Sequence, residues 1–170
     1  RYYNFSEAEI IHSTFYTVFV FSSVLPVFGW ISDKIGPRKL LYLSIIALMF
    51  LTYPSIEMIL VHDVKLHYLG LTLMIINLTP IATTIPIILA GIFPTRVRYT
   101  GVSFSYNVSQ ALASGSLPLV FAIIGHYLHS QAETVVIFFT ASSLITLLTL
   151  FFLKPHRDWF QWVESRGIIK

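Results

Sequence analysis

The stretch Gly29-Trp-Ile-Ser-Asp-Lys-Ile-Gly-Pro-Arg-Lys39 separates two long apolar segments, residues 10–30 and 40–60. Each segment has 21 residues, and Glu57, near the end of the second, is the only Asp, Glu, Lys or Arg in either. About 20 apolar residues in a helix are enough to cross roughly 30 Å of hydrocarbon. The pattern therefore predicts two transmembrane helices joined by a short basic loop.

Three further apolar segments follow, at residues 68–90, 100–128 and 134–153. Because lipid offers no hydrogen-bonding partner to the backbone, such segments are stable in a membrane as helices. We therefore predict an all-α membrane protein with five transmembrane helices, which span residues 10–153 and lie in the lipid bilayer. Residues 1–9 would form an outer N-terminal segment and residues 154–170 a cytoplasmic tail.

The composition argues against other classes of protein. Of the 170 residues, 55% are hydrophobic and 11% are charged, whereas about 25% of residues are charged in soluble domains. The net charge of +3 is small and dispersed, so we expect no nucleic-acid partner. The chain has no cysteine and no nucleophile–base pair in its spans, and His62 and His67 fall in a predicted loop without a carboxylate cluster. We therefore expect no enzyme activity, no metal site and no cofactor.

The basic residues predict how the helices are oriented. Nine of the 11 Lys and Arg residues fall on one side of the predicted bundle, namely Lys34, Arg38, Lys39, Arg96, Arg98, Lys154, Arg157, Arg166 and Lys170. The other side carries Arg1 and Lys65. Because loops rich in Lys and Arg stay in the cytoplasm, we expect a cytoplasmic C-terminus, an outer N-terminus and a location in the plasma (inner) membrane.

The basic loop at residues 29–39 resembles the signature between the second and third helices of each half in the major facilitator superfamily. Gly29 would allow two helices to approach closely, and Gly36 would permit a tight turn. The residues that carry the resemblance are Gly29, Asp33, Lys34, Gly36, Arg38 and Lys39. Pro37 stands where the family usually has a basic residue, and an ordinary basic cytoplasmic turn is the alternative interpretation.

A second motif runs from Gly91 to Gly101 and contains Pro94, Arg96 and Arg98. It resembles the loop between the tenth and eleventh helices of sugar porters and of the metabolite:proton symporter family. The following Tyr106-Asn107, Gly115 and Pro118 favour the symporters, and within them the proline/glycine-betaine transporters. Many relatives carry a glutamate at the position of Gly91. Its absence leaves Arg98 either to pair with Asp33 as a cytoplasmic gate or to act as a simple cytoplasmic anchor.

The two motifs together place the predicted helices as the eighth to twelfth of a twelve-helix transporter. The resemblance implies proton-coupled symport of a small polar or zwitterionic metabolite, osmoprotectant-like, by alternating access. It also implies a missing N-terminal half, and the absence of an initial methionine leads us to expect a fragment. We expect no signal peptide, because no basic segment followed by an apolar one begins the sequence. The alternatives are helices two to six of such a protein, a non-transporting remnant or split-gene product, and a sugar porter.

The candidate substrate-facing residues are polar side chains inside the spans, where polar groups are costly unless they face water or protein. Ser103, Asn107, Gln110 and Ser114 recur at spacings of four, three and four residues, so they share one helical face. Asn77 lies near Pro80 in the preceding span. These residues would face a substrate or would form hydrogen bonds between helices. Ser105, Ser109 and Ala113 form a second stripe, which we expect to pack closely against another helix.

Overall fold

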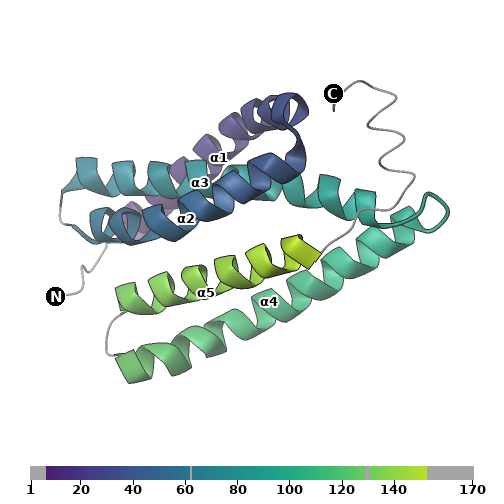
Figure 1. The fold of residues 1–170 in the computed structure, drawn as a ribbon. Coiled ribbons are helices and arrows are strands. Elements are labelled where there is room, and N and C mark those ends of the chain that lie inside the picture. Colours follow the sequence, from purple (N-terminus) through teal and green to yellow (C-terminus); the bar gives the residue numbers. More distant parts are fainter. Residues whose placement is uncertain (1–6, 62, 129–130, 153–170) are drawn as a thin grey trace.

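A computed structural model describes residues 7–61, 63–128 and 131–152, which form five α-helices (Figure 1). These are α1 (Glu7–Ile35), α2 (Pro37–Leu60), α3 (Val64–Ile92), α4 (Arg98–Leu128) and α5 (Gln131–Phe152). All five are long and apolar enough to cross a membrane. The described part of the chain contains no strand, so the predicted all-α class with five transmembrane helices is confirmed.

The turns between the helices alternate between the two ends of the bundle (Figure 1). The α1–α2 and α3–α4 turns lie at one end, and the α2–α3 turn lies at the other. A single residue, Gly36, separates α1 from α2, and its φ of 90° lies in the left-handed region that favours glycine. Pro37 then begins α2, where its fixed φ suits the first turn of a helix.

The beginning of α3 differs from the sequence prediction. We expected the third span to begin at residue 68 and placed His67 in a loop, whereas α3 begins at Val64 and contains a buried His67. Asp63 explains the difference, because its Oδ1 accepts a hydrogen bond from the backbone nitrogen of Lys65 at 2.8 Å and caps the helix. In the expected outer segment, residues 7–9 are helical and residues 1–6 lie outside the described residues. The predicted tail, 154–170, lies outside them as well.

The tightest packing joins α2 and α3. Gly70 is buried, and a Cβ atom placed on it would lie 2.7 Å from the backbone oxygen of Ser55 and 2.9 Å from the backbone nitrogen of Ile59. The backbones therefore approach more closely than any larger residue would permit. Towards the opposite end of these helices, the buried core joins α2, α3 and α5 through Leu41, Ile45, Ile88 and Leu150.

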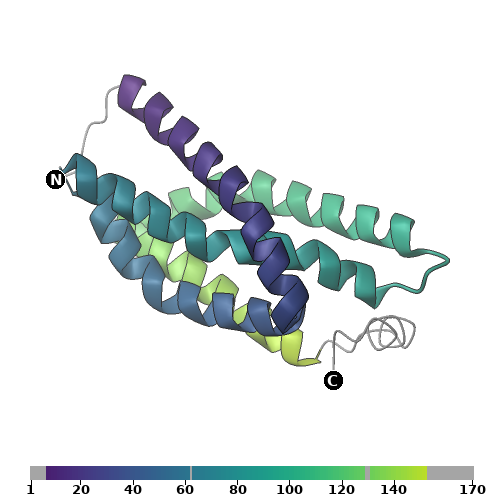
Figure 2. The same ribbon diagram turned by 90° about the horizontal axis from the view of Figure 1, so that it is seen from above.

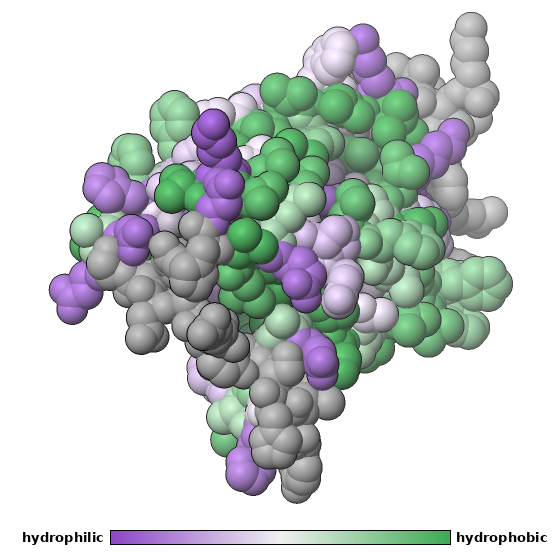
Figure 3. Space-filling view, turned by 90° about the vertical axis from the view of Figure 1, so that its left-hand side faces the viewer, coloured by the Kyte–Doolittle hydropathy of each residue, from purple (hydrophilic) through white to green (hydrophobic). Residues whose placement is uncertain are grey.

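The remaining helices are less enclosed. Figure 2 shows α1 crossing over α3, and no described side chain of α4 is buried. Hydrophobic residues cover much of the face in Figure 3, with hydrophilic residues scattered among them. Phe15, Phe19 and Phe104 are among the large apolar side chains that are exposed. Such a surface is suited to contact with lipid or with other transmembrane helices.

Candidate functional site

The first motif forms the end of α1 and the beginning of α2. Lys34 Nζ lies 3.6 Å from the ring centroid of Trp30, which is a cation–π contact. A Cβ atom on Gly29 would lie 3.9 Å from Thr83 Cγ2, an ordinary contact distance, so the approach of α1 to α3 does not require glycine here. Asp33 is exposed beside the turn, and so is Lys39, whereas Arg38 is half-buried.

The second motif forms the α3–α4 turn. Arg98 Nε donates a hydrogen bond to the backbone oxygen of Phe93 at 3.3 Å, which links the start of α4 to the end of α3. Gly101 leaves room for the Phe93 ring, since a Cβ atom there would lie 2.5 Å from Phe93 Cδ1. Pro94 accepts a backbone hydrogen bond from Val97 at 3.1 Å, and Arg96 is exposed. In the described part of the chain, no ion pair joins Arg98 to Asp33.

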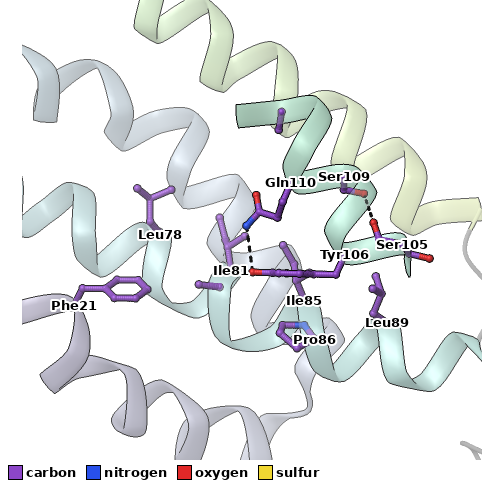
Figure 4. A pocket seen from close by; sticks show the side chains of 12 residues that line it. Phe21, Leu78, Ile81, Ile85, Pro86, Leu89, Ser105, Tyr106, Ser109 and Gln110 are labelled. Carbon is purple, nitrogen blue, oxygen red and sulfur yellow. Dashed lines mark hydrogen bonds between the residues drawn. The ribbon is translucent and has the colours of Figure 1, made fainter. Parts of the chain in front are cut away.

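A cavity of about 570 Å³ lies between α1, α3 and α4 (Figure 4). Its walls are formed by one aromatic residue of α1, one face of α3 and one face of α4. The lining residues are Phe21 from α1, Leu78, Ile81, Ala82, Ile85, Pro86 and Leu89 from α3, and Ser105, Tyr106, Ser109, Gln110 and Ala113 from α4. A cavity of mainly apolar residues with a few polar groups is the usual form of a small-molecule site.

The polar side chains in this cavity differ in their hydrogen-bond partners. The hydroxyl groups of Ser105 and Ser109 each donate at 2.7 Å to the backbone oxygen four residues earlier in α4. Gln110 Nε2 instead donates to Tyr106 Oη at 3.2 Å (Figure 4). Among the described lining residues, Tyr106 and Gln110 therefore form a hydrogen bond between their side chains, whereas the two serines bond to the helix backbone.

Pro86 leaves one backbone acceptor of α3 without its helical donor. A proline has no N–H, so Pro86 cannot donate the helical hydrogen bond to the carbonyl of Ala82, four residues before it. Both residues line the cavity. The carbonyl of Ala82 thus lacks its usual helical partner.

The structure brings only part of the predicted stripe to this cavity. Gln110 lines it, whereas Ser103 and Asn107 do not, and Asn107 Nδ2 donates to the backbone oxygen of Ser103 at 2.8 Å. Asn77 is buried elsewhere in α3, where its Nδ2 donates to the backbone oxygen of Leu73 at 2.8 Å. The side chain of Ser114 lies outside the described residues.

The small-residue stripe of α4 faces the cavity between α1, α3 and α4. Ser105, Ser109 and Ala113 line the cavity and do not pack tightly against α3. Sequence reasoning also missed Phe21 and Tyr106 as lining residues. The spacing of Tyr106 four residues before Gln110 was a usable signal, because it places both on one helical face.

The described residues contain no group of three or more His, Asp or Glu residues that could hold a metal ion. The buried His67 is used in packing instead, because its ring nitrogens form hydrogen bonds to α1 and α2. The cavity between α1, α3 and α4 is therefore the candidate functional site.

Comparison with known proteins agrees with the family resemblance of the two turn motifs. A family model described as Major Facilitator Superfamily matches residues 1–166. The chain is 31% identical over 99 residues to the "Glycine betaine/proline/ectoine/pipecolic acid transporter OusA" of Dickeya dadantii, covering 58% of this chain and 20% of that protein. It is 27% identical over 157 residues to the "Ectoine/proline transporter ProP" of Corynebacterium glutamicum, covering 87% of this chain and 30% of that protein.

A further relative is the "Alpha-ketoglutarate permease" of Escherichia coli, which is 36% identical over 107 residues, covering 61% of this chain and 24% of that protein. The matched regions thus span at most 30% of the length of these three relatives. No solved structure matches the chain.

Proposed function

The chain belongs to the Major Facilitator Superfamily, and on this basis we propose that it is the C-terminal portion of a secondary active transporter. Its five helices would be helices eight to twelve of twelve. The chain is a multi-pass integral membrane protein and not an enzyme. The proposed cargo is a small polar or zwitterionic metabolite, osmoprotectant-like, which is carried together with protons by alternating access between the two halves.

The cavity between α1, α3 and α4 is the observation that carries this proposal. It lies between three helices, and its polar side chains are an amide, a phenol and two serine hydroxyls, none of which is charged. Two relatives are named as transporters of proline, ectoine or glycine betaine, which are zwitterions. Uncharged donors are suited to such solutes, because a zwitterion brings its own counter-charge.

The residues proposed for this transport fall into two groups. The group predicted from the sequence to face the substrate is Asn77, Ser103, Asn107, Gln110 and Ser114, of which Gln110 lines the cavity and Asn77, Ser103 and Asn107 do not. The cytoplasmic gate is Gly29, Asp33, Lys34, Gly36, Arg38, Lys39, Pro94, Arg96, Arg98 and Gly101. The concentration of basic residues at the two turns of one end supports a cytoplasmic position for that end, with the C-terminus on the same side in the plasma (inner) membrane.

Uptake by the complete transporter tests the proposal. The full-length gene that includes this sequence is expressed in cells that lack uptake of proline and glycine betaine, and uptake of both labelled solutes is measured with and without a protonophore. We expect uptake of at least one zwitterion that the protonophore abolishes. Uptake of neither solute, together with uptake of a hexose, would favour a sugar porter. A gene that encodes no further transmembrane helices would favour the non-transporting remnant.

A further inference from the structure

We infer that the cavity recognises the two ends of a zwitterion separately. Tyr106 and Gln110 bind the carboxylate, and the carbonyl of Ala82 with the aromatic ring of Phe21 holds the ammonium end. This inference rests on the proposed function, and it adds the residues that select the substrate.

The carboxylate end is assigned from the pair on α4. Tyr106 and Gln110 are one helical turn apart, and both reach the cavity (Figure 4). Gln110 Nε2 donates to Tyr106 Oη at 3.2 Å. Because an amide nitrogen carries two hydrogens and the phenol keeps its own, this pair still offers two donors. Two adjacent neutral donors suit a carboxylate, which accepts through two oxygens.

The ammonium end is assigned from α3 and α1. The carbonyl of Ala82 lacks a helical donor because residue 86 is proline, and it is an acceptor for an N–H group of a cation. Phe21 brings an aromatic ring to the same cavity from α1 (Figure 4). The face of an aromatic ring attracts a cation whether or not that cation has N–H groups, including a quaternary ammonium.

The overall charge of the substrate follows from the lining. None of the described residues that line the cavity is charged. An uncompensated charge within a membrane is costly, so this lining favours a solute with no net charge. A zwitterion satisfies this condition, whereas a dicarboxylate would bring two negative charges to a wall without a cation.

Proline and glycine betaine can distinguish the carbonyl of Ala82 from the ring of Phe21, because their ammonium groups differ. Proline has a secondary ammonium with N–H groups, so it would use the carbonyl of Ala82. Glycine betaine has three N-methyl groups and no N–H, so it would depend on the ring of Phe21. Substituting Pro86→Ala returns an N–H to residue 86, which would occupy the carbonyl of Ala82 again.

The experiment compares uptake KM for proline and glycine betaine in the full-length transporter, with the abundance of each variant measured at the cell surface. Tyr106→Phe and Gln110→Leu should each raise KM for both solutes about tenfold, since each removes a donor to a charged group. Pro86→Ala should raise KM for proline about fivefold or more and change that for glycine betaine less than about twofold, because it removes one acceptor of N–H groups. Ser116→Ala is the matched control, because its hydroxyl donates within α4 and does not line the cavity.

The outcomes separate this inference from the proposed function. Wild-type protein that transports neither zwitterion would contradict the proposed function itself. If the wild type transports them and Tyr106→Phe and Gln110→Leu leave both KM values unchanged, the carboxylate assignment is wrong. Equal effects of Pro86→Ala on the two solutes would overturn the assignment to Ala82. Should that variant fail to reach the membrane, Phe21→Leu decides the ammonium end, because it should weaken glycine betaine more than proline.

Discussion

His67 Nε2 lies 3.1 Å from the hydroxyl oxygen of Ser13, so a buried imidazole of α3 is hydrogen-bonded to α1. The other ring nitrogen, Nδ1, lies 2.8 Å from the backbone oxygen of Ile59 near the end of α2. The last carbonyls of a helix have no partner within it, so a donor from a neighbouring helix is stabilising there. One side chain thus joins three helices at the end of the bundle opposite the basic turns.

Replacing His67 should therefore loosen this end of the bundle. His67→Ala leaves the Ile59 carbonyl without this partner and removes the contact to Ser13, and we expect a loss of about 1–3 kcal/mol of stability. Thermal unfolding of the purified full-length transporter in detergent measures this loss as a lower Tm. His12→Ala is the control, because His12 is exposed on α1. Equal Tm values for the two variants would show that the three-helix contact contributes nothing to stability.

Gly70→Ala should separate α2 from α3. The added Cβ would lie 2.7 Å from the backbone oxygen of Ser55, and backbone atoms cannot move aside as a flexible side chain can. We expect a loss of about 1–3 kcal/mol, which is typical of overpacking. Gly115→Ala is a matched control in α4, because a Cβ there meets no atom within 4 Å. Because alanine favours a helix more than glycine does, the control should be neutral or stabilising. An unchanged Tm for Gly70→Ala would contradict the close approach of α2 and α3.

The class of fold and the family could be predicted from the sequence because they depend on local features. The length of each apolar segment determines whether it spans the bilayer, and the two turn motifs carried a resemblance that the family match confirms. The cavity depended on tertiary packing. The sequence indicates that Ser105, Ser109 and Ala113 share a face, but not how closely α3 approaches that face. The contact between Gly70 and Ser55 likewise depends on the register of two helices, which apolar patterning does not determine.

The proposed gate predicts coupling between Asp33 and Arg98 when the transporter is closed on the cytoplasmic side. Arg98 donates here to the Phe93 carbonyl, and a carboxylate brought within reach would bind the guanidinium more strongly. Asp33→Asn and Arg98→Gln should each reduce the rate of uptake, and exchange of the two charges should restore part of it. Lys65→Gln serves as the control for loss of a positive charge, since Lys65 is exposed near the start of α3 and lies outside the proposed gate. Additive losses in the double variant would remove the case for a direct contact.

The orientation of the helices predicts which turns are accessible from outside the cell. Val61 and Val97 are a matched pair, because each is an exposed valine in a turn, with 42% and 48% of its surface accessible, and the two turns lie at opposite ends of the bundle (Figure 1). This chain has no cysteine of its own, so a cysteine introduced at either position would be the only thiol in these five helices. Because of the excess of basic residues beside Val97, we propose that this turn is cytoplasmic. An impermeant thiol reagent should therefore label Val61→Cys in intact cells and Val97→Cys only after the membrane is permeabilised. The opposite pattern would reverse the orientation, and with it the assignment of Asp33 and Arg98 to a cytoplasmic gate.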